Sequence, residues 1–197
     1  MGVGETVMGL ASYARPEEDM RATRVAAAFF VVAVLIGLTL TAAVARADGA
    51  EAQWVAVLAG KNEAPTPRDT NARGVALFFT NDDGSMSFKL IVANIYNVIL
   101  AHIHCGPAGL AGPVGVTLLM GVAPGGGRVD GILVSGSFSA PDSGNSCGWA
   151  SIADVGAAVA AGTAYVNVHT NDGIAPINTG PGDFPAGEIR GQLMLAG

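Results

Sequence analysis

GVALFFTNDDGSMSFKLIV, residues Gly74–Val92, is the stretch of sequence that decides the fold class. Its last part, Ser85–Val92, alternates between polar and apolar side chains over most of its length, which is the period of a half-buried β-strand. Gly74–Thr80 is rich in the β-branched and aromatic residues that strands favour. Between the two, Asn81–Gly84 ends in Asp-Gly, a strong hairpin signal. The stretch therefore predicts two antiparallel strands joined by a tight turn.

Further segments of the same kind follow along the chain, separated by stretches rich in turn-forming residues. The additional predicted strands are Gln53–Leu58, Ile99–Cys105, Val114–Leu119, Ile132–Phe138, Ala164–Thr170 and Glu188–Leu195. One short helix is expected after Ser151, which begins a capping-box pattern with Asp154, and Gly162 would end it. Many short strands with one helix predict an all-β protein, an antiparallel β-sandwich or barrel.

The N-terminal part of the chain resembles a secretory signal. The uncharged apolar run Val25–Val44 follows Arg21 and Arg24, and it ends in AVARA, which contains two small-x-small sites. We expect residues 1–47 to be a leader and signal peptide, with Met20 as a candidate true start, and residues 48–197 to be the domain. The protein would then be secreted, or located in the periplasm or cell envelope. The alternative is a membrane anchor, because an uncleaved run of this length can span a bilayer.

Composition limits the classes of partner. Only 13% of the residues are charged, half are hydrophobic, and the formal net charge is −6. This excludes a disordered chain. No basic run lies outside the N-terminus, so we expect no nucleic-acid partner, and contact with a membrane only through the signal segment if it is retained.

The chain has two cysteines, Cys105 and Cys147. In an exported protein, an even number of cysteines predicts a disulfide bond. Its Cα atoms would lie within about 7 Å of each other. The alternative is that the thiolates bind a metal.

Three predicted strands each carry polar residues at alternate positions, and such residues share one face of a strand. His102 and His104 lie on one strand, Tyr165, Asn167 and His169 on the second, and Glu188 and Arg190 on the third. Three histidines with an open fourth position suit zinc or copper. The sequence thus offers His102, His104 and His169 as metal ligands, with Glu188 as a fourth ligand or as an acceptor that orients an imidazole. Ligands of one zinc ion must come within about 3–4 Å of one another.

A simpler interpretation remains open. Polar rows on the solvated face of an antiparallel sheet need no function. On that interpretation Glu188 and Arg190 pair weakly on the surface of one strand, and the histidines bind Asn167, Tyr165 or loop carbonyls. No nucleophilic or paired-carboxylate catalytic set is convincing. We therefore expect no catalytic residues, with a metal-dependent oxidoreductase as the alternative.

Four blocks of the sequence, in order, resemble the CHRD (chordin-type) domain family: LAGKNEAPTP with Gly74, ILAHIHCGPAGLAGPV, AYVNVHT and AGEIRGQL. The resemblance covers about residues 55–195. It implies an extracytoplasmic, Ig-like β-sandwich module. Within chordin such modules belong to a secreted protein that binds bone morphogenetic proteins, but a single exported domain need not share that role. The segment Asn171–Gly187 is longer than the family's usual link and would lie beside His169.

AHIHCGPAG also resembles the histidine-pair strand of copper/zinc superoxide dismutases. Three histidines in all are too few for a two-metal site, though one metal ion could be held. We expect an exported, non-catalytic binding or structural module whose partner is an extracytoplasmic protein or a surface ligand. The alternative is a mononuclear copper- or zinc-binding protein.

Overall fold

The computed structural model describes residues 53–196 together with Met1. The expected leader, with its apolar run and Met20, lies outside the described residues. Within residues 53–196, no helix combines the length and the apolar character that crossing a membrane requires.

The strands form one antiparallel sheet, in the order β5-β4-β7-β8-β1-β2-β3-β6, with β9 paired to β1. The elements are β1 (Trp54–Ala59), the 3-10 turn η1 (Gly60–Asn62), β2 (Arg73–Thr80), β3 (Met86–Tyr96), β4 (Val98–Cys105), β5 (Val114–Leu119), β6 (Arg128–Phe138), α2 (Ile152–Ala160), β7 (Ala164–Thr170), β8 (Ile189–Gln192) and β9 (Met194–Leu195).

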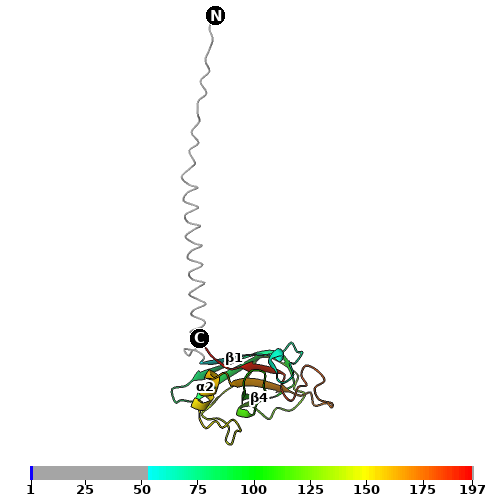
Figure 1. The fold of residues 1–197 in the computed structure, drawn as a ribbon. Helices are drawn as coiled ribbons and strands as arrows, with labels where there is room; N and C mark the ends of the chain where they lie inside the picture. The colour runs from blue at the N-terminus through cyan, green and yellow to red at the C-terminus, as the bar shows by residue number, and fades with distance from the viewer. Residues whose placement is uncertain (2–52, 197) are drawn as a thin grey trace. The chain divides into compact units, whose positions relative to one another are not determined.

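Figure 1 shows the sheet folded over on itself, with β1 in one layer, β4 in the other, and α2 at one end. The two outermost strands of the order, β5 and β6, approach each other, so the sheet is a nearly closed barrel. The expected all-β, antiparallel sandwich or barrel with one short helix is confirmed.

The hairpin that the sequence predicts is present. β2 and β3 pair along their length, from Arg73 opposite Ala93 to Thr80 opposite Met86. Gly84 closes the turn at φ +81°, a conformation that glycine adopts without steric cost. The alternate residues Met86, Phe88 and Leu90 point into the core and are almost fully buried. Alternation in the sequence therefore identified the buried face.

Two strands extend several residues beyond their predicted ends. β3 continues to Tyr96 and β6 begins at Arg128, because the two pair beyond a bulge near Asn94. Asn94 has a φ of +56°, and its backbone N–H donates to the Asp130 carboxylate at 2.8 Å. A bulge interrupts the alternation on which strand prediction depends, so the sequence pattern ended the strand too early.

The helix α2 begins as the sequence predicts. The Ser151 side chain accepts from the Asp154 amide, and the Asp154 carboxylate accepts from the Ser151 amide, which completes a capping box. Val155 and Val159 are its buried residues, and they join the hydrophobic core. The helix therefore covers one end of the barrel.

One row of aliphatic side chains remains on the outside of the sheet. Val57, Val75, Ile91 and Ile132 pair in register across β1, β2, β3 and β6. Val57 is 59% exposed and Ile132 is 61% exposed.

Candidate metal centre

The polar row that the sequence predicts lies on three neighbouring strands. β4 pairs with β7, so that His102 is opposite Asn167 and His104 is opposite Tyr165. β7 pairs with β8, so that Asn167 is opposite Arg190. Residues opposite each other in an antiparallel pair point to the same side. The pairing thus gathers these side chains on one face.

This face is not solvated, which is where the simpler interpretation of the sequence differs from the structure. Every residue of β7 is buried, on both sides of the strand. His104 and His169 are each 7% exposed, and Arg190 is 1% exposed. The loops that follow β4 and β7 contact this face through Gly112 and Pro185.

The three histidines converge. One ring nitrogen from each of His102, His104 and His169 lies within 4.8 Å of the others. His102 Nδ1 lies 3.2 Å from His169 Nε2. The first distance is somewhat longer than the 3–4 Å expected of ligands around one ion, and the second falls within that range. The half-buried ring of His102 has the most room to adjust.

Backbone carbonyls fix the proton on two of the rings. His104 Nδ1 is 2.9 Å from the Gly112 carbonyl oxygen, and His169 Nδ1 is 3.0 Å from that of Pro185. A carbonyl oxygen only accepts, so each Nδ1–H donates and each Nε2 carries a lone pair. In His104 this Nε2 is buried and has no hydrogen-bond partner within the described part of the chain. His104 therefore presents an unpartnered nitrogen, and His169 presents an Nε2 lone pair that faces His102 Nδ1 at 3.2 Å.

Burial keeps the imidazoles uncharged. It lowers the pKa of His104 and of His169 to about 4, and it lowers the pKa of His102 as well. Smaller contributions come from the mutual repulsion of the rings when they are protonated. At neutral pH all three rings are neutral, which is the form that binds a metal ion.

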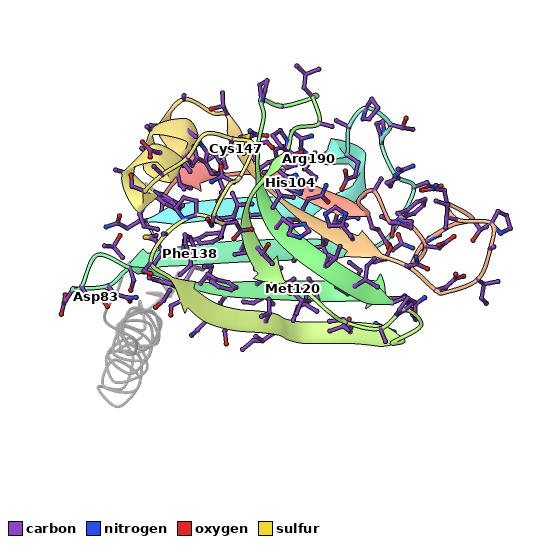
Figure 2. The ribbon with its side chains drawn as sticks, turned by 90° about the horizontal axis from the view of Figure 1, so that it is seen from below. Asp83, His104, Met120, Phe138, Cys147 and Arg190 are labelled. Atoms are coloured by element: carbon purple, nitrogen blue, oxygen red, sulfur yellow. A yellow bond between two sulfur atoms is a disulfide. The ribbon has the colours of Figure 1, made fainter. Side chains whose placement is uncertain are left out.

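Tyr165 and Arg190 form a layer beside His104. The Tyr165 ring is parallel to the His104 ring, and the Arg190 guanidinium carbon lies 3.4 Å from the centre of the Tyr165 ring. Figure 2 shows His104 and Arg190 in the same part of the molecule. Arg190 donates to the carbonyl oxygens of Leu110 at 2.8 Å and Pro107 at 2.9 Å. It thereby fastens the loop whose Gly112 carbonyl holds His104.

Glu188 is held by groups other than those the sequence suggested. Its carboxylate accepts from the hydroxyls of Thr70 and Thr170, both at 2.7 Å, and from the Gly182 amide at 2.8 Å. It is fully buried and does not belong to the histidine group. The expected surface pair of Glu188 with Arg190 is absent from the described residues, because Arg190 donates to loop carbonyls instead.

Sequence reasoning missed Glu63, which lies just after η1 in the turn-rich stretch between the first two predicted strands. Its side chain is 6% exposed, and burial raises its pKa to about 7 against the opposing charges of Arg190 and Arg68. Asn167 Nδ2 donates to Glu63 Oε2 at 3.5 Å. Glu63 belongs to the LAGKNEAPTP block, and that block was the signal that could have marked it.

The cysteines form the predicted disulfide. Cys105 and Cys147 are bonded, with their Cα atoms 5.7 Å apart, and no described cysteine is free. The alternative of thiolate metal ligands is therefore wrong. The bond ties the end of β4 to the segment that carries Asp142, a carboxylate that raises the pKa of His102 against the larger effect of burial. A disulfide is compatible with an extracellular protein.

Comparison with known proteins supports the family assignment. The family model for the CHRD domain matches residues 54–193, which is most of the chain and nearly all of the described part. Searches of curated proteins and of solved structures found no significant match. The matched range includes β1 through β8 and all three histidines. The chain belongs to the CHRD domain family.

Proposed function

We propose that this protein is an exported, non-catalytic module that binds one copper or zinc ion through His102, His104 and His169. The observation that carries the proposal is the convergence of three ring nitrogens within 4.8 Å. Imidazole is a preferred ligand of both metals, and three protein ligands are a common number at sites that retain an exchangeable fourth position.

The tautomers support this function. The carbonyls of Gly112 and Pro185 accept from Nδ1 of His104 and His169, which leaves Nε2 for the metal. Metal-bound histidines almost always donate their other N–H to a carbonyl, carboxylate or water in this way. In the metal-free protein, His102 Nδ1–H donates to His169 Nε2. On binding, His102 would take its other tautomer, with the proton on Nε2, and remain neutral. The buried Nε2 of His104, which has no hydrogen-bond partner in the metal-free protein, gains the metal ion as its partner.

Metal analysis of the purified protein tests the proposal. The chain contains three histidines in all, so the protein must be studied after any affinity tag is removed. We expect one equivalent of Cu(II) or Zn(II) to bind the wild-type protein, and His104→Ala or His169→Ala to bind at least about tenfold more weakly. The control is Gln192→Ala on the same row, whose side chain donates to the carbonyls of Gly106 and Gly162.

An equal affinity in the histidine variants and the wild-type protein would disprove the proposal. Export has its own test, which is the location of the tag-free protein in cell fractions. Support for export comes from the apolar N-terminal segment of the sequence and from the disulfide.

A protein or surface-ligand partner is a second, separate function. The row of Val57, Val75, Ile91 and Ile132 favours it, with Val75 half-buried and the other three exposed, because contiguous apolar surface is uncommon on a monomer that contacts nothing. Val57→Asp with Ile132→Asp would then abolish co-purification of an extracytoplasmic partner without changing metal content. A metal content that falls in this variant would contradict the separation of the two functions.

A further inference from the structure

We propose that the metal ion held by His102, His104 and His169 takes a small monovalent anion, such as hydroxide, chloride or azide, as its fourth ligand. This inference rests on the proposed metal site, and it concerns what completes that site. It follows from the charges around the three rings and from the hydrogen bonds that the nearby carboxylates already make.

The first argument is the charge of the ligand set. The group that could hold a metal contains three imidazoles and neither a carboxylate nor a thiolate within the described residues. Three neutral ligands leave the full double positive charge of Cu(II) or Zn(II) on the ion. Burying such a charge without a counter-charge is costly. A monovalent anion at the fourth position removes half of it.

The second argument is that no described carboxylate lies close enough to the three ring nitrogens to join them around one ion. Both oxygens of Glu188 accept from threonine hydroxyls. Both oxygens of Asp142 accept from Thr117, one from the amide at 3.1 Å and one from the hydroxyl at 2.7 Å. The two sulfurs are bonded to each other. The fourth ligand must therefore come from solution.

The third argument is Arg190. Its guanidinium is buried, its direct partners are the neutral carbonyls of Leu110 and Pro107, and it contacts the Tyr165 ring that is stacked on His104. Glu63 is the acid that interacts with the charge of Arg190. Because the pKa of Glu63 is about 7, this acid is partly protonated at neutral pH. Asp142, near His102, offsets one positive charge in the neighbourhood. The negative charge of Asp142 acts on His102 and the positive charge of Arg190 acts on His104, so these two charges offset each other and the charge of the ion remains to be balanced.

Azide titration of the Cu(II)-loaded, tag-free protein tests the proposal. We expect azide to bind with one-to-one saturation and to produce the azide-to-copper charge-transfer absorption. Acetonitrile, a neutral end-on nitrogen donor, should leave the spectrum unchanged at the same concentration. Arg190→Gln should weaken azide binding roughly tenfold, while Arg190→Lys should restore most of the affinity.

The control is Arg128→Gln, which removes one charge from the exposed Arg128–Asp130 pair on β6 and should change azide affinity less than about twofold. If Arg190→Gln fails to fold, the wild-type comparison of azide with acetonitrile still decides. Stoichiometric copper without an azide response would overturn the anion proposal alone. Failure to bind copper would overturn the metal site and, with it, the anion proposal. Equal responses to azide and acetonitrile would show an open position without preference for an anion, which also contradicts it.

Discussion

The imidazole of His104 lies flat against the phenol ring of Tyr165, with ring centroids 4.9 Å apart and planes 7° from parallel. The Tyr165 hydroxyl reaches the same residue as His104 Nδ1, because the Gly112 amide donates to it at 3.0 Å. The ring of His104 is thus fixed on one side by stacking and at one nitrogen by the Gly112 carbonyl. Its remaining nitrogen has one direction in which to point, toward His169 and His102.

Tyr165 therefore acts as a positioning residue for the metal ligands. Tyr165→Phe retains the stacked ring and loses the contact with Gly112, so we expect metal affinity to fall only a few-fold. Tyr165→Leu removes the stack and should weaken metal binding about tenfold or more, the usual cost of losing a group that orients a ligand. Competition titration with a chelator measures both. Equal affinities in Tyr165→Leu and the wild-type protein would show that the stack has no part in holding His104.

Metal binding should persist at mildly acidic pH. A proton competes with the metal only near or below the pKa of the ligand, and burial lowers the pKa of His104 and His169 to about 4. An ordinary histidine, with a pKa near 6.5, would lose about tenfold in affinity per ligand at pH 5.5. We expect the copper or zinc affinity to fall less than about tenfold in total between pH 7.5 and pH 5.5. A fall of about a thousandfold would mean that the three rings titrate as exposed imidazoles.

Glu63 should make the protein less stable as the pH rises. Its pKa is raised to about 7 in the folded state and is near 4.5 when unfolded, so the folded state binds the proton more tightly. Its stabilising contribution is therefore full below about pH 4.5 and is lost as the pH rises through about 7. Relative to wild type, Glu63→Gln should gain up to about 3 kcal/mol between pH 4.5 and pH 8. Urea unfolding of the two metal-free proteins measures this difference in free energy. The histidines titrate in both proteins, so their opposing contribution cancels. A constant difference across this range would contradict the raised pKa.

The disulfide should stabilise the folded state mainly through the unfolded chain. Cys105 and Cys147 are 42 residues apart, and closing a loop of that length contributes about 4 kcal/mol in the chain-entropy model. We expect the double variant Cys105→Ser, Cys147→Ser to lose roughly that much free energy of unfolding. Reducing agent should destabilise the wild-type protein and leave the double variant unchanged. A loss below about 1 kcal/mol would show that the cross-link constrains little.

Gly187 should tolerate no side chain. Its φ is +132°, and a Cβ atom there would lie 2.6 Å from Asn167 Nδ2 and 2.9 Å from Glu63 Oε1. Gly187→Ala should therefore destabilise by about 2 kcal/mol or more. Gly121→Ala is the control, because Gly121 also has a positive φ, +75°, but open space around its Cα. Equal losses of thermal stability would mean that backbone strain alone accounts for the effect.

Much of the fold could be predicted because alternation is a local property. Met86, Phe88 and Leu90 point inward as their spacing required, and β5 and β7 begin and end at the predicted residues. Strand order could not be predicted, because the neighbours of β8 are β7 and β1, and β1 comes from the opposite end of the domain. Pairings between such distant segments leave no local pattern.

The histidine group was predictable for the same reason, and the environment of the group was not. His102 and His104 occupy alternate positions of one strand and therefore share a face. The pairing of β4 with β7 brings His169 next to them. The acids behaved otherwise. Glu188 lies at the expected alternate position, but its carboxylate accepts hydrogen bonds from Thr70 and Thr170. The buried Glu63 belongs to a segment with no periodic signal. Burial by loops depends on tertiary packing that spacing does not encode.

The most direct test of the metal site is a crystal structure of the protein soaked in Zn(II), with anomalous diffraction recorded on both sides of the zinc absorption edge. We predict one anomalous peak bonded to Nε2 of His104, Nε2 of His169 and a ring nitrogen of His102, each about 2.0–2.1 Å away. A fully soaked crystal in which the three rings keep the 3.2 Å contact between His102 and His169, with no peak between them, would contradict it.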